Sequence, residues 1–192
     1  LNRSIAELQT VINHTRQLKQ YFPKSSRPMI IINAGGFSSD DFLTHEIRSE
    51  MYTHVANMLS TLNDQGVEII IQTMPPFPWH FGGQSHHNLF VRPEEIQEFC
   101  QKYGYRLCYD VSHSKLACNY LQESLEFFTD MVAPYTAHLH IADARNTRDE
   151  GLQIGEGEID FVALWRKLSE KCPNASFIPE VWQGHKNSGE GF

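Results

Sequence analysis

The sequence lacks several features that would assign it to a class at once. Its 192 residues include only four cysteines, and no two of them form a C-x-x-C pair. We find no signal peptide and no apolar run of about 18 residues, the length that a membrane helix needs. Low-complexity tracts and repeats of solenoid length are also missing. These absences favour one globular domain without a membrane partner, and we expect it to be cytoplasmic.

Net positive charge is missing as well. The formal net charge is -7, and the isoelectric point lies near 5.8. A protein that binds nucleic acid through its phosphates usually offers a basic surface. The charge balance therefore disfavours a nucleic-acid partner.

What the sequence does contain is a regular alternation of helices and strands. Apolar, β-branched runs predict five strands at 28–33, 67–72, 106–110, 137–142 and 176–181. Helical spacing of apolar residues predicts a helix at 4–22, one through Ile47 to Leu62, one that Pro93 begins and Gly104 ends, one carrying Leu121, Leu125, Phe128 and Val132, and one that Asp160 caps and Pro173 ends. Apolar strands joined through helices indicate a parallel sheet.

Polar residues at the strand ends distinguish an open doubly wound sheet from a barrel. Each strand ends in one inward-facing polar side chain: Asn33, Gln72, Asp110, His140 and Glu180. In a barrel these residues converge at the end where active sites are built. We therefore predict an α/β protein with a (β/α)8 TIM barrel fold in which only the last five βα units are present, as a single domain over residues 1–192. Because the first strands are missing from this pattern, we expect either a homodimer or further domains of a longer chain.

Three of these side chains form a candidate metal site. Asp110, His140 and Glu180 combine two carboxylates with an imidazole, a set that suits Mn²⁺, Zn²⁺, Co²⁺ or Mg²⁺. The alternative is a buried salt-bridge network. His113, three residues after Asp110, can reach the same ion or its ligand. We expect His138, one layer deeper, to support a metal ligand or to be a core histidine with a hydrogen-bond partner.

The residues "YDVSH", "HLHIAD" followed by "IGEGEIDF", and "IPEVW" resemble the xylose-isomerase-like TIM barrels of the AP endonuclease family 2 superfamily. That family includes sugar isomerases and epimerases, inosose dehydratases and the endonuclease IV group. The resemblance implies a divalent metal ion held by Asp110, His140 and Glu180, with His113 as a ligand or substrate contact. It also implies that "GEG" at 155–157 is a turn into the next helix.

Gln72 departs from the family pattern, in which the fifth barrel strand usually ends in a glutamate that binds metal and acts as an acid/base. An amide oxygen can still coordinate a metal, but an amide cannot transfer a proton at neutral pH. Gln72 therefore disfavours an epimerisation that uses two carboxylates. For an endonuclease IV-like phosphodiesterase, Asn33 and Gly151 stand where histidines are expected, which disfavours that activity.

Two loops offer candidate substrate contacts. The loop at 73–90 contributes Trp79, His80 and Gln84, which could contact a sugar or simply close the barrel mouth, and its length favours an ordered lid. The segment after Glu180 contributes His185 and Lys186, which suit a phosphate unless they belong to a frayed terminus. Asn33 and Arg145 complete the set of candidate substrate contacts.

We interpret the sequence as a metal-dependent isomerase or epimerase that acts on a sugar or sugar phosphate through an enediol. In this interpretation Glu180 is the base and His113 an acid. The alternative is a catalytically impaired barrel domain that binds sugar or serves as a scaffold in a larger protein.

Overall fold

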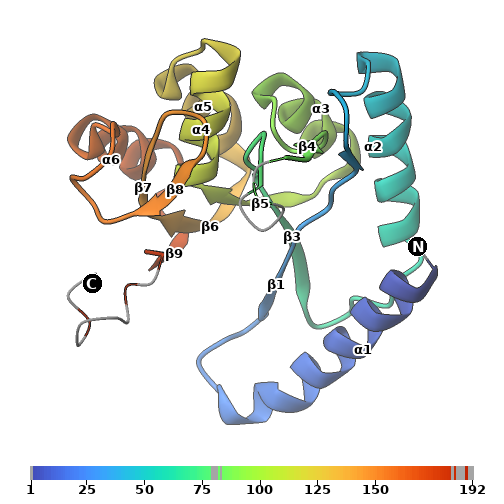
Figure 1. Ribbon diagram of the computed structural model, residues 1–192. Coiled ribbons are helices and arrows are strands. Elements are labelled where there is room, and N and C mark those ends of the chain that lie inside the picture. Colours follow the sequence, from blue (N-terminus) through green and yellow to red (C-terminus); the bar gives the residue numbers. More distant parts are fainter. Residues whose placement is uncertain (1, 79–81, 83, 183, 185–188, 190–192) are drawn as a thin grey trace.

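The computed structural model describes residues 2–78, 82, 84–182, 184 and 189. Its centre is a five-stranded parallel sheet in the order β1-β3-β5-β6-β9 (Figure 1). The strands are β1 (Met29–Ile32), β3 (Glu68–Gln72), β5 (Arg106–Asp110), β6 (Thr136–Ile141) and β9 (Ser176–Pro179). Each predicted strand is present, and the curved parallel sheet confirms a partial TIM barrel.

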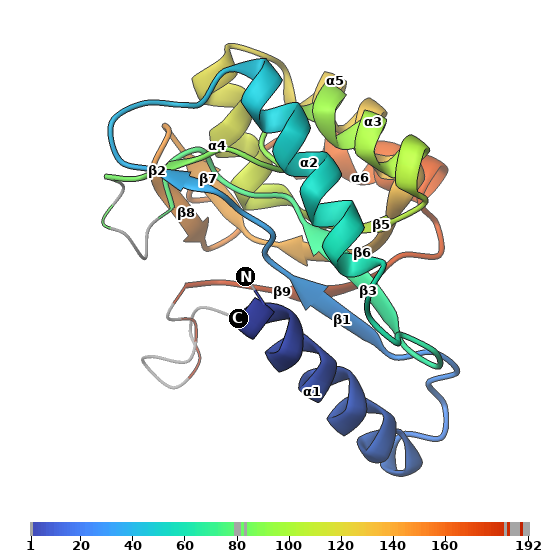
Figure 2. The same ribbon diagram turned by 90° about the vertical axis from the view of Figure 1, so that its right-hand side faces the viewer.

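Five helices cover one face of the sheet: α2 (His45–Leu59), α3 (Pro93–Tyr103), α4 (Val111–Leu121), α5 (Leu125–Val132) and α6 (Phe161–Lys171). Figure 2 shows these helices above the sheet and α1 (Asn2–Leu18) below, beside β1. The main core lies between the sheet and the helices and includes Ile71, Tyr109 and Leu139 from the strands. Alternate strand residues therefore point to the opposite, barrel-facing side.

Helix boundaries follow the expected signals. Pro93 occupies the first turn of α3, and Gly104 ends that helix with a φ of 75°. The Asp160 side chain accepts hydrogen bonds from the amides of Val162 and Ala163, so it caps α6 as predicted.

The structure corrects one helix and adds two small sheets. Two helices, α4 and α5, replace the single predicted helix through Leu121 and Val132, because Gln122 takes a left-handed conformation that interrupts it. A short antiparallel pair joins β2 (Phe37–Ser38) to β4 (His86–His87). Another joins β7 (Asp143–Arg145) to β8 (Asp149–Leu152). Neither pair is predicted by the sequence pattern, because the strands are too short to show a period.

Among the described helices, none combines the length and the apolar character needed to cross a bilayer.

Candidate functional site

The register of the sheet places the predicted strand-end residues side by side. Asp110 on β5 is paired with His140 on β6, and His140 is paired with Ile178 on β9. Glu180 lies two residues beyond Ile178 and therefore points to the same side of the sheet. Gln72 ends β3 beside β5. Four of the five predicted strand ends thus converge at the carboxyl end of the sheet.

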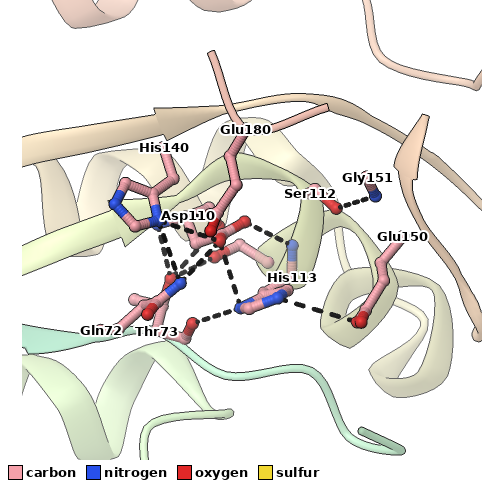
Figure 3. Close-up of polar contacts among 10 residues, drawn as sticks. Gln72, Thr73, Asp110, Ser112, His113, His140, Glu150, Gly151 and Glu180 are labelled. Atoms are coloured by element: carbon pink, nitrogen blue, oxygen red, sulfur yellow. Dashed lines mark hydrogen bonds and ion pairs between the residues drawn. The ribbon is translucent and has the colours of Figure 1, made fainter. Parts of the chain in front are cut away.

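Short contacts join these four side chains (Figure 3). The His140 Nδ1 atom lies 2.5 Å from Glu180 Oε2 and 3.6 Å from Asp110 Oδ2. The Gln72 amide nitrogen donates to Asp110 Oδ2 at 2.8 Å and lies 3.2 Å from His140 Nδ1. All four side chains therefore share one small space.

The cluster is buried on one side and open on the other. Asp110 and His140 expose 2% and 6% of their surface, whereas 51% of the Glu180 side chain is accessible. Two carboxylates held this close repel each other unless a cation or a proton lies between them. A solute could approach the cluster from the Glu180 side.

The pKa values show how the cluster is balanced. Burial alone would lower the pKa of His140, but hydrogen bonds with Asp110, Cys108 and Glu180 outweigh burial and raise that pKa well above its ordinary value. Burial alone would raise the pKa of Asp110, but the charge of His113 and the hydrogen bond from His140 hold it below its ordinary value. The site therefore favours an ionised Asp110 beside a protonated His140.

The donor set fits a divalent cation. One ligand atom each from Asp110, His140 and Glu180 lies within 4.8 Å of the others. In the described part of the chain, the ion pairs of both carboxylates are made with histidines rather than with lysine or arginine. Histidine can lose its proton and give its nitrogen to a metal, whereas arginine cannot. Gln72 would have to turn its amide over to offer its oxygen.

His113 lies next to the cluster, on the first turn of α4. Its backbone amide donates to Asp110 Oδ1 at 2.9 Å, so Asp110 both faces the site and caps the helix. The His113 Nδ1 atom lies 3.0 Å from the Thr73 carbonyl oxygen and 3.3 Å from Asp110 Oδ2. The Thr73 hydroxyl also accepts a hydrogen bond from the Asp110 amide. Sequence reasoning missed Thr73, whose position directly after Gln72 was the available signal.

A second residue that the sequence analysis missed is Glu150 on β8. Its Oε2 atom lies 3.7 Å from the His113 Nε2 atom, on the side of the ring away from Asp110 (Figure 3). The next residue, Gly151, donates its amide to the Ser112 hydroxyl at 2.9 Å. Both contacts join α4 to residues far along the chain, and they depend on how the β7–β8 pair packs against the start of that helix.

Other predicted site residues lie outside the cluster. Asn33 is exposed and lines a cavity between α1 and α2. Gln84 is exposed, and Arg145 pairs with Asp149 at 3.3 Å. Trp79, His80, His185 and Lys186 lie outside the described residues. The roles of all these residues in substrate binding stay predictions.

Two further expectations concern local structure. His138 is buried, and its Nδ1 atom lies 2.7 Å from the Ser176 hydroxyl, as expected for a core histidine with a partner.

The "GEG" turn is held by buried Asp143, whose carboxylate accepts hydrogen bonds from the amides of Gly155 and Gly157. A side chain at Gly157 would collide with that carboxylate. Backbone geometry is therefore sufficient to explain this motif.

Comparisons with known proteins place this geometry in context. The model of a family described as xylose isomerase-like TIM barrel matches residues 3–192. An uncharacterized protein of Methanocaldococcus jannaschii is 25% identical over 130 residues, which are 65% of this chain and 40% of that protein. A D-tagatose 3-epimerase-like protein has a TM-score of 0.70 at 20% identity, with 98% of this chain and 67% of the other covered. For an L-ribulose 3-epimerase, the TM-score is 0.68 at 16% identity, with 99% of this chain and 59% of the other covered.

Proposed function

The chain belongs to the xylose isomerase-like TIM barrel family, and from this premise we propose that it is a divalent-metal-dependent isomerase or epimerase of a sugar or sugar phosphate. The observation that carries the proposal is the convergence of Asp110, His140 and Glu180 at the carboxyl end of the sheet. Enzymes with this fold build their active sites at that end. Because the chain spans 67% and 59% of the two epimerase structures, the activity of the whole protein is part of the proposal.

Asp110, His140 and Glu180 would hold the metal, and Gln72 would add its amide oxygen after turning over. A bound Mn²⁺, Zn²⁺, Co²⁺ or Mg²⁺ would supply Lewis acidity toward neighbouring sugar oxygens. Asp110 is fixed by its helix cap and by Thr73, so it would bind without a large loss of side-chain freedom. The half-exposed carboxylate of Glu180 is the group that can most readily approach a substrate.

Glu180 would remove the proton beside the sugar carbonyl, which gives an enediol. His113 would donate a proton to a substrate oxygen. Its ring lies beside Asp110 but comes from α4 rather than from a strand end, so it is not one of the three proposed metal ligands. Gln72 cannot take part in proton transfer. One carboxylate and one histidine would therefore do the work that two glutamates do in the family pattern.

An exchange experiment tests this function. The protein, loaded with Mn²⁺ or Co²⁺, is incubated in D₂O with D-tagatose, L-ribulose and their phosphates. Passage through an enediol should place deuterium on the carbon that loses its proton, and NMR should detect both the label and the new isomer. Glu180→Gln should abolish the exchange. If the metal-loaded protein, with its site occupied, labels none of these sugars, isomerase activity on this class of substrate is excluded.

A second candidate function is a barrel domain that binds sugar or acts as a scaffold without catalysis. The observation that favours it is the Gln72 amide, which donates to Asp110 and so already satisfies part of the cluster without a metal. Metal content after purification without added metal distinguishes the metal-dependent enzyme from the non-catalytic domain. A stoichiometric ion supports the enzyme, and its absence supports the scaffold.

The compartment and partners belong to the same proposal. The four cysteines are free and buried, which supports a reducing, cytoplasmic setting. Within the described strands, β1 and β9 form the two edges of the sheet. Further strands, from a longer chain or from a second copy, would close the barrel beside them.

A further inference from the structure

Asp110, one of the three proposed metal ligands, stands where β5 passes into α4. The neighbouring strand β3 ends at Gln72, and the Thr73 amide continues the pairing with β5 by donating to the Cys108 carbonyl at 3.0 Å. One step further along, the partner of the Asp110 amide is the Thr73 hydroxyl, at 2.9 Å. A side-chain hydroxyl therefore continues the pairing between the two strands at the residue that faces the site.

The Thr73 hydroxyl uses all of its hydrogen-bonding capacity. It accepts from the Asp110 amide and, at 3.0 Å, from the Ser114 hydroxyl on α4, and it donates to the Asp110 carbonyl at 3.2 Å. A hydroxyl has one hydrogen to donate and two lone pairs to accept with, so no capacity is left. Thr73 and Ser114 are fully buried, and Asp110 exposes 2% of its surface. Because these groups are shielded from solvent, loss of the hydroxyl would leave the Asp110 amide without a partner.

The two carboxylate oxygens of Asp110 have different partners (Figure 3). Its Oδ1 atom accepts from the His113 amide at 2.9 Å and so caps α4. Its Oδ2 atom faces the site, where it accepts from the Gln72 amide nitrogen at 2.8 Å and lies 3.6 Å from His140 Nδ1 and 3.3 Å from His113 Nδ1. A turn of the carboxylate away from this position would break the cap. The place of Oδ2 therefore depends on an Asp110 backbone that stays fixed.

We propose that Thr73 is a positioning residue for the proposed metal site. Its hydroxyl, supported by Ser114, clamps the backbone of Asp110, so that Oδ1 stays in the helix cap and Oδ2 alone is offered to a divalent cation. The inference rests on the proposed function, because it takes Asp110 as a metal ligand. Residues that orient a metal ligand typically contribute about 10- to 100-fold to metal affinity, so the effect of the clamp is measurable.

Calorimetric titration with Co²⁺ tests the clamp. Thr73→Val removes the hydroxyl at nearly constant volume and should lower Co²⁺ affinity by about 10- to 100-fold. Thr73→Ser keeps the hydroxyl and should bind Co²⁺ as the parent protein does. Thr136→Val is the matched control, because the Thr136 hydroxyl is also buried but donates to the Val132 carbonyl at the amino end of β6. This control should lower stability and leave Co²⁺ affinity unchanged.

The visible absorption spectrum of bound Co²⁺ distinguishes positioning from a loss of stability. The spectrum depends on the ligand atoms and their geometry, so it should change in Thr73→Val and stay as in the parent in Thr73→Ser and Thr136→Val. Parent affinity or an unchanged spectrum in folded Thr73→Val would overturn the proposal. If Thr73→Val does not fold, Ser114→Ala takes its place, since it removes the donor to the Thr73 hydroxyl. It should lower Co²⁺ affinity, and parent affinity in this variant would overturn the proposal.

Hydrogen exchange at the His113 amide does not depend on metal. Without metal, this amide should exchange faster in Thr73→Val than in the parent, because the cap loosens with the Asp110 backbone, while Thr136→Val keeps the parent rate. If the parent binds no Co²⁺ but the exchange rate rises, the proposed function fails while the clamp on Asp110 stands. An unchanged rate in folded Thr73→Val would remove the clamp. If the parent then still binds Co²⁺, the proposed function stands without it.

Discussion

Two charged clusters in this molecule both contain short ion pairs between largely buried side chains, but they differ in construction. One joins Arg48 on α2 to Glu95 on α3, in the helix layer. The other joins Asp110, His140 and Glu180 at the end of the sheet. Arg48 and Glu95 expose 9% and 10% of their side chains, so that pair is buried about as deeply as Asp110 and His140.

The helix-layer pair is internally complete. The Arg48 guanidinium contacts both Glu95 oxygens, at distances between 2.6 and 3.1 Å, and also donates to the Leu43 carbonyl. A permanent cation therefore neutralises the one carboxylate. The strand-end cluster instead places two carboxylates around a histidine and an amide. The structural pair carries a permanent cation, whereas in the described residues the strand-end carboxylates pair only with histidines, which is the donor set of the metal site that we propose.

The largest expected effect concerns Arg48. Arg48→Met should lower the free energy of unfolding by about 3–5 kcal/mol, because Glu95 is left buried without its cation. Metal content should not change. Urea denaturation and metal analysis check the two expectations.

The double variant Arg48→Met with Glu95→Leu is the matched control and should recover most of the stability, since neither charge is then left alone. A loss below about 1 kcal/mol for the single variant would show that the pair is not a stabilising element.

The next effect separates the two histidines of β6. His140→Ala should lower metal affinity by more than about 100-fold. Even the loss of a residue that only hydrogen-bonds to a metal ligand lowers metal affinity by about 10- to 100-fold. The fold should survive, because His140 lies near the carboxyl end of β6 and outside the main core. His138→Ala should cost stability instead, through the lost contact with Ser176. Calorimetric metal titration and urea denaturation of both variants provide the comparison. Equal metal affinity in the two variants would contradict these roles.

A smaller effect is expected at Gln72. Gln72→Glu adds a negative charge beside Asp110 and should tighten metal binding by about tenfold or more. Without metal, the same variant should be less stable than the parent, because its carboxylate replaces an amide that donates to Asp110. Calorimetric titration at neutral pH measures the first expectation, and thermal unfolding with a chelator measures the second. Exposed Gln101→Glu is the control and should change neither quantity.

The smallest expected effect is on stability, at the amino ends of β3 and β5, opposite to the candidate site. Glu68 on β3 accepts two hydrogen bonds from Arg106 on β5, both at 2.7 Å, and these lower its pKa. A lowered pKa in the folded state contributes stability above the unfolded value near 4.5, and this contribution is lost as pH falls through the folded value. Glu68→Gln should cost less than about 1 kcal/mol at pH 7 and nothing at pH 3. Urea denaturation at both pH values checks the expectation, and an equal loss at both would contradict it.

Much of the fold could be predicted because its signals are local. The strand at 106–110 and the helix from Pro93 to Tyr103 have the expected bounds, since apolar runs, proline and glycine act over a few residues. The break at Gln122 could not be predicted, because a non-glycine residue in the left-handed region gives no signal in the sequence. The short β2–β4 and β7–β8 pairs depend on partners elsewhere in the chain.

The candidate site divides in the same way. The sequence by itself determined that Gln72, Asp110, His140 and Glu180 would meet, because parallel strands in register bring their carboxyl ends to one place. Only the tertiary structure decided that Thr73 and Glu150 flank His113 and that Asn33 lies apart. Those positions depend on how loops between distant elements pack, and the residues in them carry no period that a single sequence can reveal.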